Sequence, residues 1–315
     1  MNVTKQNHEN NKISWGRIGL FLAIAFLPVW ILAWVPEWIN ADEDMLPVAQ
    51  IVWAICMLFP AASAFMVPAI IKGKTRTYKK TLVDYGLNFK RWWFIIIGWG
   101  LPVILGFIAL GITLLTGWGS WDPSGNAMLE ELHSMLPAEQ YAKAVEQMQN
   151  PLLVVLMYVQ PLTIGAIFNS IFTFGEEFGW RGLLQTELKP AGYWKSSLLI
   201  GVIWGIWHIP FIVQGHNYPD EPLWGTFMMV AFCILGSLIL GYLRLRSGSV
   251  FPAVIYHAVL NGTVGVFLML SGAPDRFLGP GLGASGFIAM IITLVFFILF
   301  DFRFFFPRKK GVVKP

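Results

Sequence analysis

Long apolar runs constrain this chain more than any other feature of its sequence. Eight stretches of about 20 mostly apolar residues follow one another, and a helix of that length crosses the hydrocarbon core of a bilayer. Hydrophobic residues make up 56% of the chain and charged residues only 13%, which excludes an ordinary soluble domain. The sequence therefore predicts an all-α, polytopic membrane protein with about eight transmembrane helices. They lie at about 17–36, 45–71, 92–118, 151–175, 195–213, 223–243, 250–271 and 284–306.

Basic residues gather on one side of this predicted bundle. Segment 72–91 carries seven Lys or Arg against one Asp, and the same side holds Lys189, Lys195, Arg244, Arg246, Arg308, Lys309 and Lys310. The opposite loops are acidic or neutral, with Glu37, Asp42, Glu43, Asp44, Asp122, Glu130, Glu131, Glu139 and Glu146. The positive-inside rule then places both termini in the cytoplasm, with the first span retained, and in the plasma membrane if the protein is bacterial. The net charge of +4 favours anionic lipids as partners, and nucleic acid has no support.

The domain organisation predicted from the sequence is simple. Because neither an internal repeat nor a low-complexity linker is evident, we predict a single membrane domain over 1–315. Its motif-bearing core is about 151–271. The loop 119–150 is expected to form two short amphipathic helices at the outer surface. Outside the spans, His8, His133 and His216 are interpreted as ordinary solvated residues.

Both cysteines, Cys56 and Cys233, lie inside apolar runs. A disulfide framework and a cysteine metal site are therefore not supported, and we interpret both as small core residues. Neither cysteine falls beside a candidate base in the sequence, so we expect no cysteine nucleophile.

Polar residues that do not belong in a lipid environment are concentrated in three of the spans. The fourth span ends in Glu176, Glu177 and Arg181. A charge at membrane depth is costly and is seldom kept without a partner or a task. Glu177 and Arg181 are four residues apart with the acid first, the favourable order for a helical ion pair. Glu176 points about 100° away from Glu177, so it needs a partner from another helix.

The other two spans carry His208 in one and His257 with Asn261 in the other. His257 and Asn261 are four residues apart and share a helix face. Pro210 should break the helix beside His208, which is tolerated where the break lines a cavity. Close backbone approach at Gly175, Gly179, Gly182, Gly201 and Gly205 would let the polar groups meet. With Glu176 near the inner end of its span, we expect a site in the cytoplasmic half that opens inward.

One Glu, two His and one Asn make up a set of side chains suited to hydrolysis. A shielded carboxylate can act as a general base for water, with help from His, while Asn and imidazole N–H groups can hold an oxyanion. One Glu and two His are equally the ligand types of a catalytic zinc ion. Without an HExxH sequence, such a site would be assembled from separate helices, by Glu176, His208 and His257. The cofactor prediction is therefore either none or zinc.

These residues carry a resemblance to a known family. EEFGWR (176–181) resembles the EExxxR motif of the CPBP family, the CAAX proteases and bacteriocin-processing or immunity proteins also called Abi, and HAVLN (257–261) resembles its HxxxN motif. The segment around His208 is similar to its second motif, with Trp204 where the family usually has Phe. We interpret that change as one of packing. The order of the motifs over 172–262 is similar to that in type II CAAX prenyl endopeptidases.

The resemblance implies roles for the individual residues. Glu176 with His208 would activate water, His257 with Asn261 would form the oxyanion site, and Glu177 and Arg181 would support them. The family has been described both as metalloprotease and as metal-independent glutamate protease, and Asn261 favours the second because an amide suits an oxyanion better than a metal ion.

Three classes of function compete on this sequence. The first is an intramembrane endopeptidase that hydrolyses a peptide bond of a membrane-associated substrate, CAAX-type or related, by glutamate-activated water. The second is a membrane binding or bacteriocin-immunity protein that uses the same fold without cleaving. The third is a proton-coupled transporter, which the lack of evident inverted repeats makes the weakest of the three.

Overall fold

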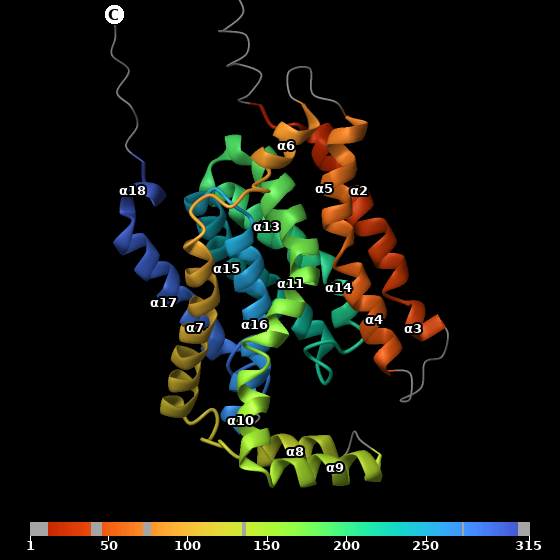
Figure 1. Ribbon diagram of the computed structural model, residues 1–315, viewed down its shortest axis with the longest axis vertical. Coiled ribbons are helices and arrows are strands. Elements are labelled where there is room, and N and C mark those ends of the chain that lie inside the picture. The colour runs from red at the N-terminus through yellow and green to blue at the C-terminus, as the bar shows by residue number, and fades with distance from the viewer. Residues whose placement is uncertain (1–11, 39–45, 72–76, 134–136, 273, 308–315) are drawn as a thin grey trace, which may run out of the picture.

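The computed structural model describes residues 12–38, 46–71, 77–133, 137–272 and 274–307, and within them the chain forms helices and turns without a strand (Figure 1). The acidic residues 42–44, the basic residues 308–310 and His8 of the sequence analysis lie outside these ranges. In chain order the helices are α2 (Trp15–Leu32), α3 (Val35–Trp38), α4 (Leu46–Cys56), α5 (Phe59–Ile70), α6 (Tyr78–Asp84), α7 (Phe94–Thr116), α8 (Asn126–His133), α9 (Ala138–Met148), α10 (Pro151–Val159), α11 (Ile164–Glu177), the π-helix η2 (Phe178–Leu184), α12 (Gln185–Glu187), the 3-10 turn η3 (Lys189–Ala191), α13 (Tyr193–Trp207), α14 (Ile209–Ile212), α15 (Pro222–Ser247), α16 (Phe251–Leu270), α17 (Ala284–Phe300) and α18 (Phe302–Phe305).

Each of the eight predicted spans is helical, which confirms an all-α polytopic membrane protein. Six helical stretches of the described chain are long and apolar enough to cross a membrane. The predicted spans 195–213 and 284–306 fall short of that length, because their helices are interrupted at His208 and at Asp301. The six stretches are Trp15–Trp38, Ala49–Ile70, Phe94–Thr116, Pro151–Glu187, Pro222–Ser247 and Phe251–Leu270.

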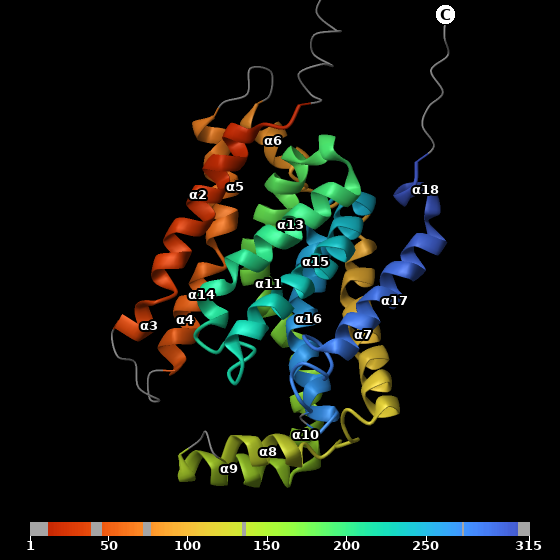
Figure 2. The same ribbon diagram turned by 180° about the vertical axis from the view of Figure 1, so that it is seen from behind.

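The bundle has two ends that differ in charge. At the end where α2 begins and α18 ends, the upper end in Figures 1 and 2, lie Arg17, Lys79, Lys80, Lys90, Arg91, Lys189, Lys195, Arg244, Arg246 and Arg303. We call this the basic end. The opposite end carries Glu37, Asp122, Glu130, Glu139, Glu146, Asp220, Glu221 and Asp275 against Lys143 and Arg276, and we call it the acidic end.

The loop predicted to lie at the outer surface forms α8 and α9, as expected, and both lie beyond the bundle at the acidic end. Asp122 fixes the start of this arm by accepting hydrogen bonds from the backbone N–H groups of Ser124, Gly125 and Ala127 and from the Ser124 hydroxyl. Burial by itself raises the pKa of Asp122, but these four bonds outweigh it and lower the pKa below its usual value.

Close backbone contacts hold the central helices together, as the glycine spacing predicted. Gly201 and Gly205 of α13 lie against the backbone of α15, where an added Cβ would come within 2.5 Å of the Ile234 Cα and 2.6 Å of the Val230 Cα. Gly175 of α11 lies against the Met57 carbonyl, at the junction of α4 and α5. Any larger residue at these positions would force the helices apart.

The fourth predicted span does not end where its apolar run ends. After Glu177 the helix continues without a break through η2 and α12 to Glu187. Eleven further residues at about 1.5 Å each place Glu176 roughly 17 Å from the basic end rather than close to it. Because of this extension, Glu176 lies at the level of Trp204 on α13 and His257 on α16. The position close to the inner end of the span, expected from the sequence, is corrected accordingly.

Candidate active site

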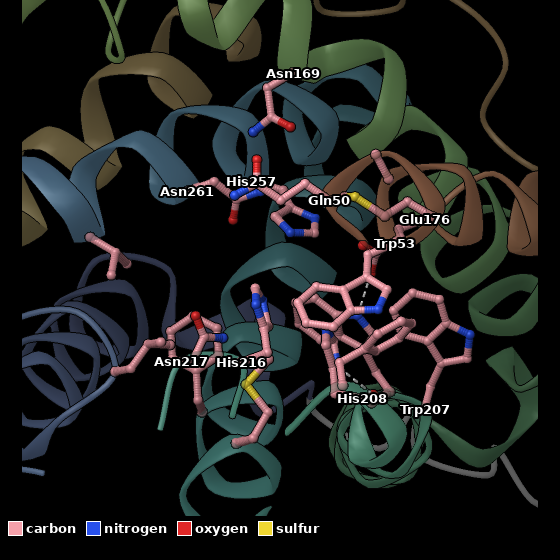
Figure 3. A pocket seen from close by; sticks show the side chains of 18 residues that line it. Gln50, Trp53, Asn169, Glu176, Trp207, His208, His216, Asn217, His257 and Asn261 are labelled. Carbon is pink, nitrogen blue, oxygen red and sulfur yellow. Dashed lines mark hydrogen bonds between the residues drawn. The ribbon is translucent and has the colours of Figure 1, made fainter. Parts of the chain in front are cut away.

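The four residues singled out for chemistry line one cavity of about 500 Å³. Glu176 comes from α11, His208 from the break between α13 and α14, and His257 and Asn261 from α16. Figure 3 shows Asn169, His257 and Asn261 along one side of the cavity and His208 and His216 on the other. The rest of the wall is mainly aromatic and apolar, with Trp53, Met57, Trp204, Trp207, Phe211, Met229, Phe232, Val264 and Leu282.

Glu176 has a hydrogen-bond partner on another helix, as its position about 100° away from Glu177 predicted, and that partner is uncharged. The carboxylate is 2% exposed, and its Oε2 accepts a hydrogen bond from the indole Nε1 of Trp204 on α13 at 2.6 Å. Phenylalanine could not make this bond. Trp204 thus does more than pack in the place of phenylalanine, because its N–H group holds the carboxylate by a hydrogen bond.

Trp204→Phe is expected to lower kcat of the activity proposed below by about ten- to hundredfold, because a hydrogen bond to a charged group contributes about 1.5–3 kcal/mol. KM should change less, since an aromatic ring is retained in the cavity wall. The matched control is Trp207→Phe, which removes an indole N–H in the same cavity wall that donates to the Ala25 carbonyl at 3.1 Å. Equal losses of kcat in the two variants would contradict an orienting role for Trp204.

Glu177 forms the predicted ion pair and has a second partner that the sequence did not reveal. Its Oε1 accepts from Arg181 Nη1 and from His257 Nδ1, both at 3.0 Å. Glu177 is 0% and Arg181 1% exposed. Arg181 also donates to the Ser237 hydroxyl at 2.9 Å and lies 4.5 Å over the Trp204 ring. A carboxylate only accepts, so His257 donates through Nδ1, and its Nε2 remains for the cavity that it lines.

His208 lies in the helix break that Pro210 was expected to cause. Its ring Nδ1 is 2.8 Å from the Trp204 carbonyl oxygen. Because a carbonyl oxygen can only accept, Nδ1 carries the proton, and Nε2 of the neutral ring is an acceptor. His208 is thus held as a base whose free nitrogen can take part in chemistry in the cavity.

Cys233 lies nearer to a candidate base than the sequence analysis expected. Its Sγ is 3.8 Å from His208 Nδ1, so the statement that neither cysteine falls beside such a base is wrong. The separation of 25 residues along the chain hid this contact. Cys233 is 0% exposed, and the nitrogen it faces already bonds the Trp204 carbonyl. Its environment is that of the packed core, as predicted for both cysteines.

Sequence reasoning missed several residues of the cavity wall. Asn169 lies two helical turns before Glu176 and donates through Nδ2 to the Ala258 carbonyl at 3.2 Å. An amide on that face of an apolar span was a signal that could have found it. His216 was interpreted as a solvated loop residue, but it lines the cavity and packs its ring edge-on to Trp53, with 5.3 Å between the centroids. Gln50 and Asn217 complete the polar part of the wall.

The three side chains predicted as zinc ligands, Glu176, His208 and His257, all line the cavity but are not grouped as a metal site. Within the described residues, no group of three or more His, Cys, Asp or Glu side chains is placed to hold a metal ion.

Comparison with known proteins agrees with the motifs. Residues 153–263 match the family model described as Rce1-like, type II CAAX prenyl endopeptidase. A segment of 92 residues is 28% identical to a CAAX prenyl protease 2 from Methanococcus maripaludis, covering 27% of this chain and 34% of that protein. The chain thus spans about a third of the length of that curated relative. The family match includes all six motif residues, from Glu176 to Asn261, and confirms the resemblance to CPBP-type CAAX proteases.

Proposed function

We propose that this chain, whose residues 153–263 match the type II CAAX prenyl endopeptidases, is an intramembrane endopeptidase that hydrolyses a peptide bond of a membrane-associated substrate. The observation that carries the proposal is the environment of Glu176. A buried carboxylate with one neutral donor faces a cavity that also holds two histidines and an asparagine. A structural carboxylate would be paired with a cation, as the neighbouring Glu177 is.

In the proposed mechanism, Glu176 removes a proton from a water molecule, while His208 Nε2 accepts the second hydrogen bond of that water and orients it. The hydroxide attacks the carbonyl carbon of the scissile bond, and the negative charge moves to the carbonyl oxygen. Glu176 then delivers its proton to the departing nitrogen. Water is consumed, one peptide bond is broken, and Glu176 returns to the carboxylate form.

The oxyanion is held from α16. Asn261 supplies an amide N–H to the oxyanion, and the ring of His257 lies on the same face of α16, held by its Nδ1–H bond to Glu177 Oε1. Arg181 donates to the same oxygen and fixes the Glu177 carboxylate in turn. In this arrangement Glu177 and Arg181 act as positioning residues.

We also propose the orientation and the setting. The basic end faces the cytoplasm, in the plasma membrane if the protein is bacterial, and lipids surround the apolar helices. The cavity wall is rich in tryptophan and phenylalanine and suits apolar side chains. A CAAX-type peptide or another apolar membrane peptide has this chemistry.

The test is peptide cleavage by the purified protein in lipid. Internally quenched peptides are added: a prenylated CAAX peptide, the same peptide without prenyl, and an unrelated apolar membrane peptide, each with and without a chelator. We expect cleavage of at least one peptide at an internal bond, identified by mass spectrometry. Folded protein that cleaves none of the three would contradict the proposal and favour the immunity function.

A further inference from the structure

Asn169 is a polar residue of the cavity wall that the proposed mechanism does not use. It belongs to the first half of α11, where the neighbouring side chains of Ile167, Phe168 and Ile171 are 69%, 66% and 62% exposed and suit contact with lipid. Asn169 itself is half-buried and lines the cavity instead. An amide in an apolar span is kept where it has a partner or a task, so its contacts indicate what it does.

One half of the Asn169 amide is held by helix α16. Nδ2 donates a hydrogen bond to the Ala258 carbonyl at 3.2 Å. Because a carbonyl oxygen can only accept, this bond identifies the nitrogen and orients the amide. Among the residues that the structure describes, Asn169 Oδ1 has no hydrogen-bond partner, and it is not one of the fully enclosed polar atoms. The oxygen is thus an oriented acceptor in the wall of the cavity.

Asn169 and Glu176 lie on one face of α11. They are seven residues apart, which is two turns of the helix, so about 10 Å separates them along its axis. An extended peptide rises about 3.3 Å per residue. A substrate that lies along α11 with its scissile bond at Glu176 therefore places, beside Asn169, the backbone of a residue about three positions from that bond.

Backbone N–H groups of a bound peptide need acceptors in this cavity, because most of its wall is apolar. In the proposed mechanism Glu176 and His208 are occupied by water, and Asn261 holds the carbonyl oxygen of the scissile bond. Asn169 Oδ1 is an acceptor that none of these steps uses.

We propose that Asn169 Oδ1 accepts a hydrogen bond from a backbone N–H of the substrate, about three residues from the scissile bond, and so aligns an extended peptide along α11. The inference rests on the proposed function and deepens it. At this position the site binds the peptide backbone rather than a side chain. Substrates are therefore extended segments whose sequence at this position can vary.

Thr173 offers a matched control, because it makes the same kind of contact outside the cavity. Its hydroxyl donates to the Val254 carbonyl of α16 at 3.1 Å, and the residue is 0% exposed and does not line the cavity. Thr173→Val thus removes a side-chain bond from α11 to α16, as Asn169→Leu does, but it removes no acceptor for a substrate.

The test measures peptide binding, so it does not depend on cleavage. Both changes are made in the Glu176→Gln protein in lipid nanodiscs, and each protein is titrated with fluorescently labelled forms of the three peptides of the cleavage test. Asn169→Leu is expected to raise the Kd about five- to hundredfold, because it leaves a backbone N–H of the peptide without its acceptor in an apolar wall. Thr173→Val should leave the Kd unchanged. An equal rise in both variants would assign the effect to helix packing and overturn the inference.

Peptides in which one backbone amide is replaced by an ester locate the bond, since an ester lacks the N–H and adds no bulk. We expect one such replacement, about three residues from the scissile bond, to weaken binding to the protein that carries Asn169 and to have no effect on Asn169→Leu. Esters that act equally in both proteins at every position, or a lack of binding by all three peptides, would overturn the inference.

Failure of the proposed function gives a different result. If the wild type cleaves none of the peptides while their binding depends on Asn169 and on one backbone N–H, endopeptidase activity is contradicted and the contact stands. If the peptides are cleaved but Asn169→Leu binds them as tightly as the protein with Asn169, the contact is contradicted and endopeptidase activity stands.

Discussion

Glu176→Gln is expected to abolish peptide hydrolysis while leaving the protein folded. Glutamine has nearly the same shape, and its amide oxygen can still accept the bond from Trp204 Nε1. It cannot take a proton from water, and loss of a general base costs about a hundred- to ten-thousandfold in rate. The measurement is kcat/KM for a peptide that the wild type cleaves, together with the thermal unfolding midpoint in the same detergent.

The control for this variant is Glu139→Gln on α9, where the carboxylate is 81% exposed and far from the cavity. It should cleave at the wild-type rate. If Glu176→Gln kept more than a tenth of the wild-type kcat/KM, Glu176 would not be the base, and the role would pass to His208 alone.

Arg181→Met is expected to destabilise the protein by about 3–5 kcal/mol, because it leaves the Glu177 charge buried with its strongest partner removed. Methionine retains most of the apolar volume against Trp204, so a cavity adds little to this loss. The free energy of unfolding is measured by denaturant titration in mixed micelles.

Two further variants separate charge from packing. The double variant Glu177→Gln with Arg181→Met removes both charges and should recover a large part of the stability. Lys143→Ala breaks a pair with the same four-residue spacing, Glu139 to Lys143 at 2.7 Å, whose side chains are 81% and 67% exposed, and should cost only a few tenths of a kcal/mol. A double variant as unstable as Arg181→Met would show that the charge pair is not the cause.

Much of the fold could be predicted because lipid imposes a strong rule on composition. A span must be apolar along its length, so the helices show themselves as apolar runs. The rule fails where protein rather than lipid surrounds the helix. The stretch from Glu176 to Glu187 contains four charged and two polar side chains, yet it is helical because its neighbours bury most of it. The apolar run that marks the fourth predicted span therefore ends at Glu176. Because the position of Glu176 was inferred from the end of that run, it was predicted too close to the basic end.

The candidate site was predicted to the extent that its residues share a helix. Glu177 with Arg181, and His257 with Asn261, follow from a spacing of four residues. The contacts of Glu176 with Trp204, Glu177 with His257 and Cys233 with His208 join different helices. They depend on how helices pack, which spacing along one helix does not encode. Asn169 was visible in the sequence but was not recognised.

Glu177 Oε1 is shared by two donors, and this ties the stability of the helix bundle to the geometry of the cavity. Arg181 and His257 both donate to that one oxygen at 3.0 Å, so a change that displaces the guanidinium also displaces the acceptor that holds the imidazole ring. Arg181→Met should therefore slow cleavage as well as lower the free energy of unfolding, although Arg181 does not line the cavity.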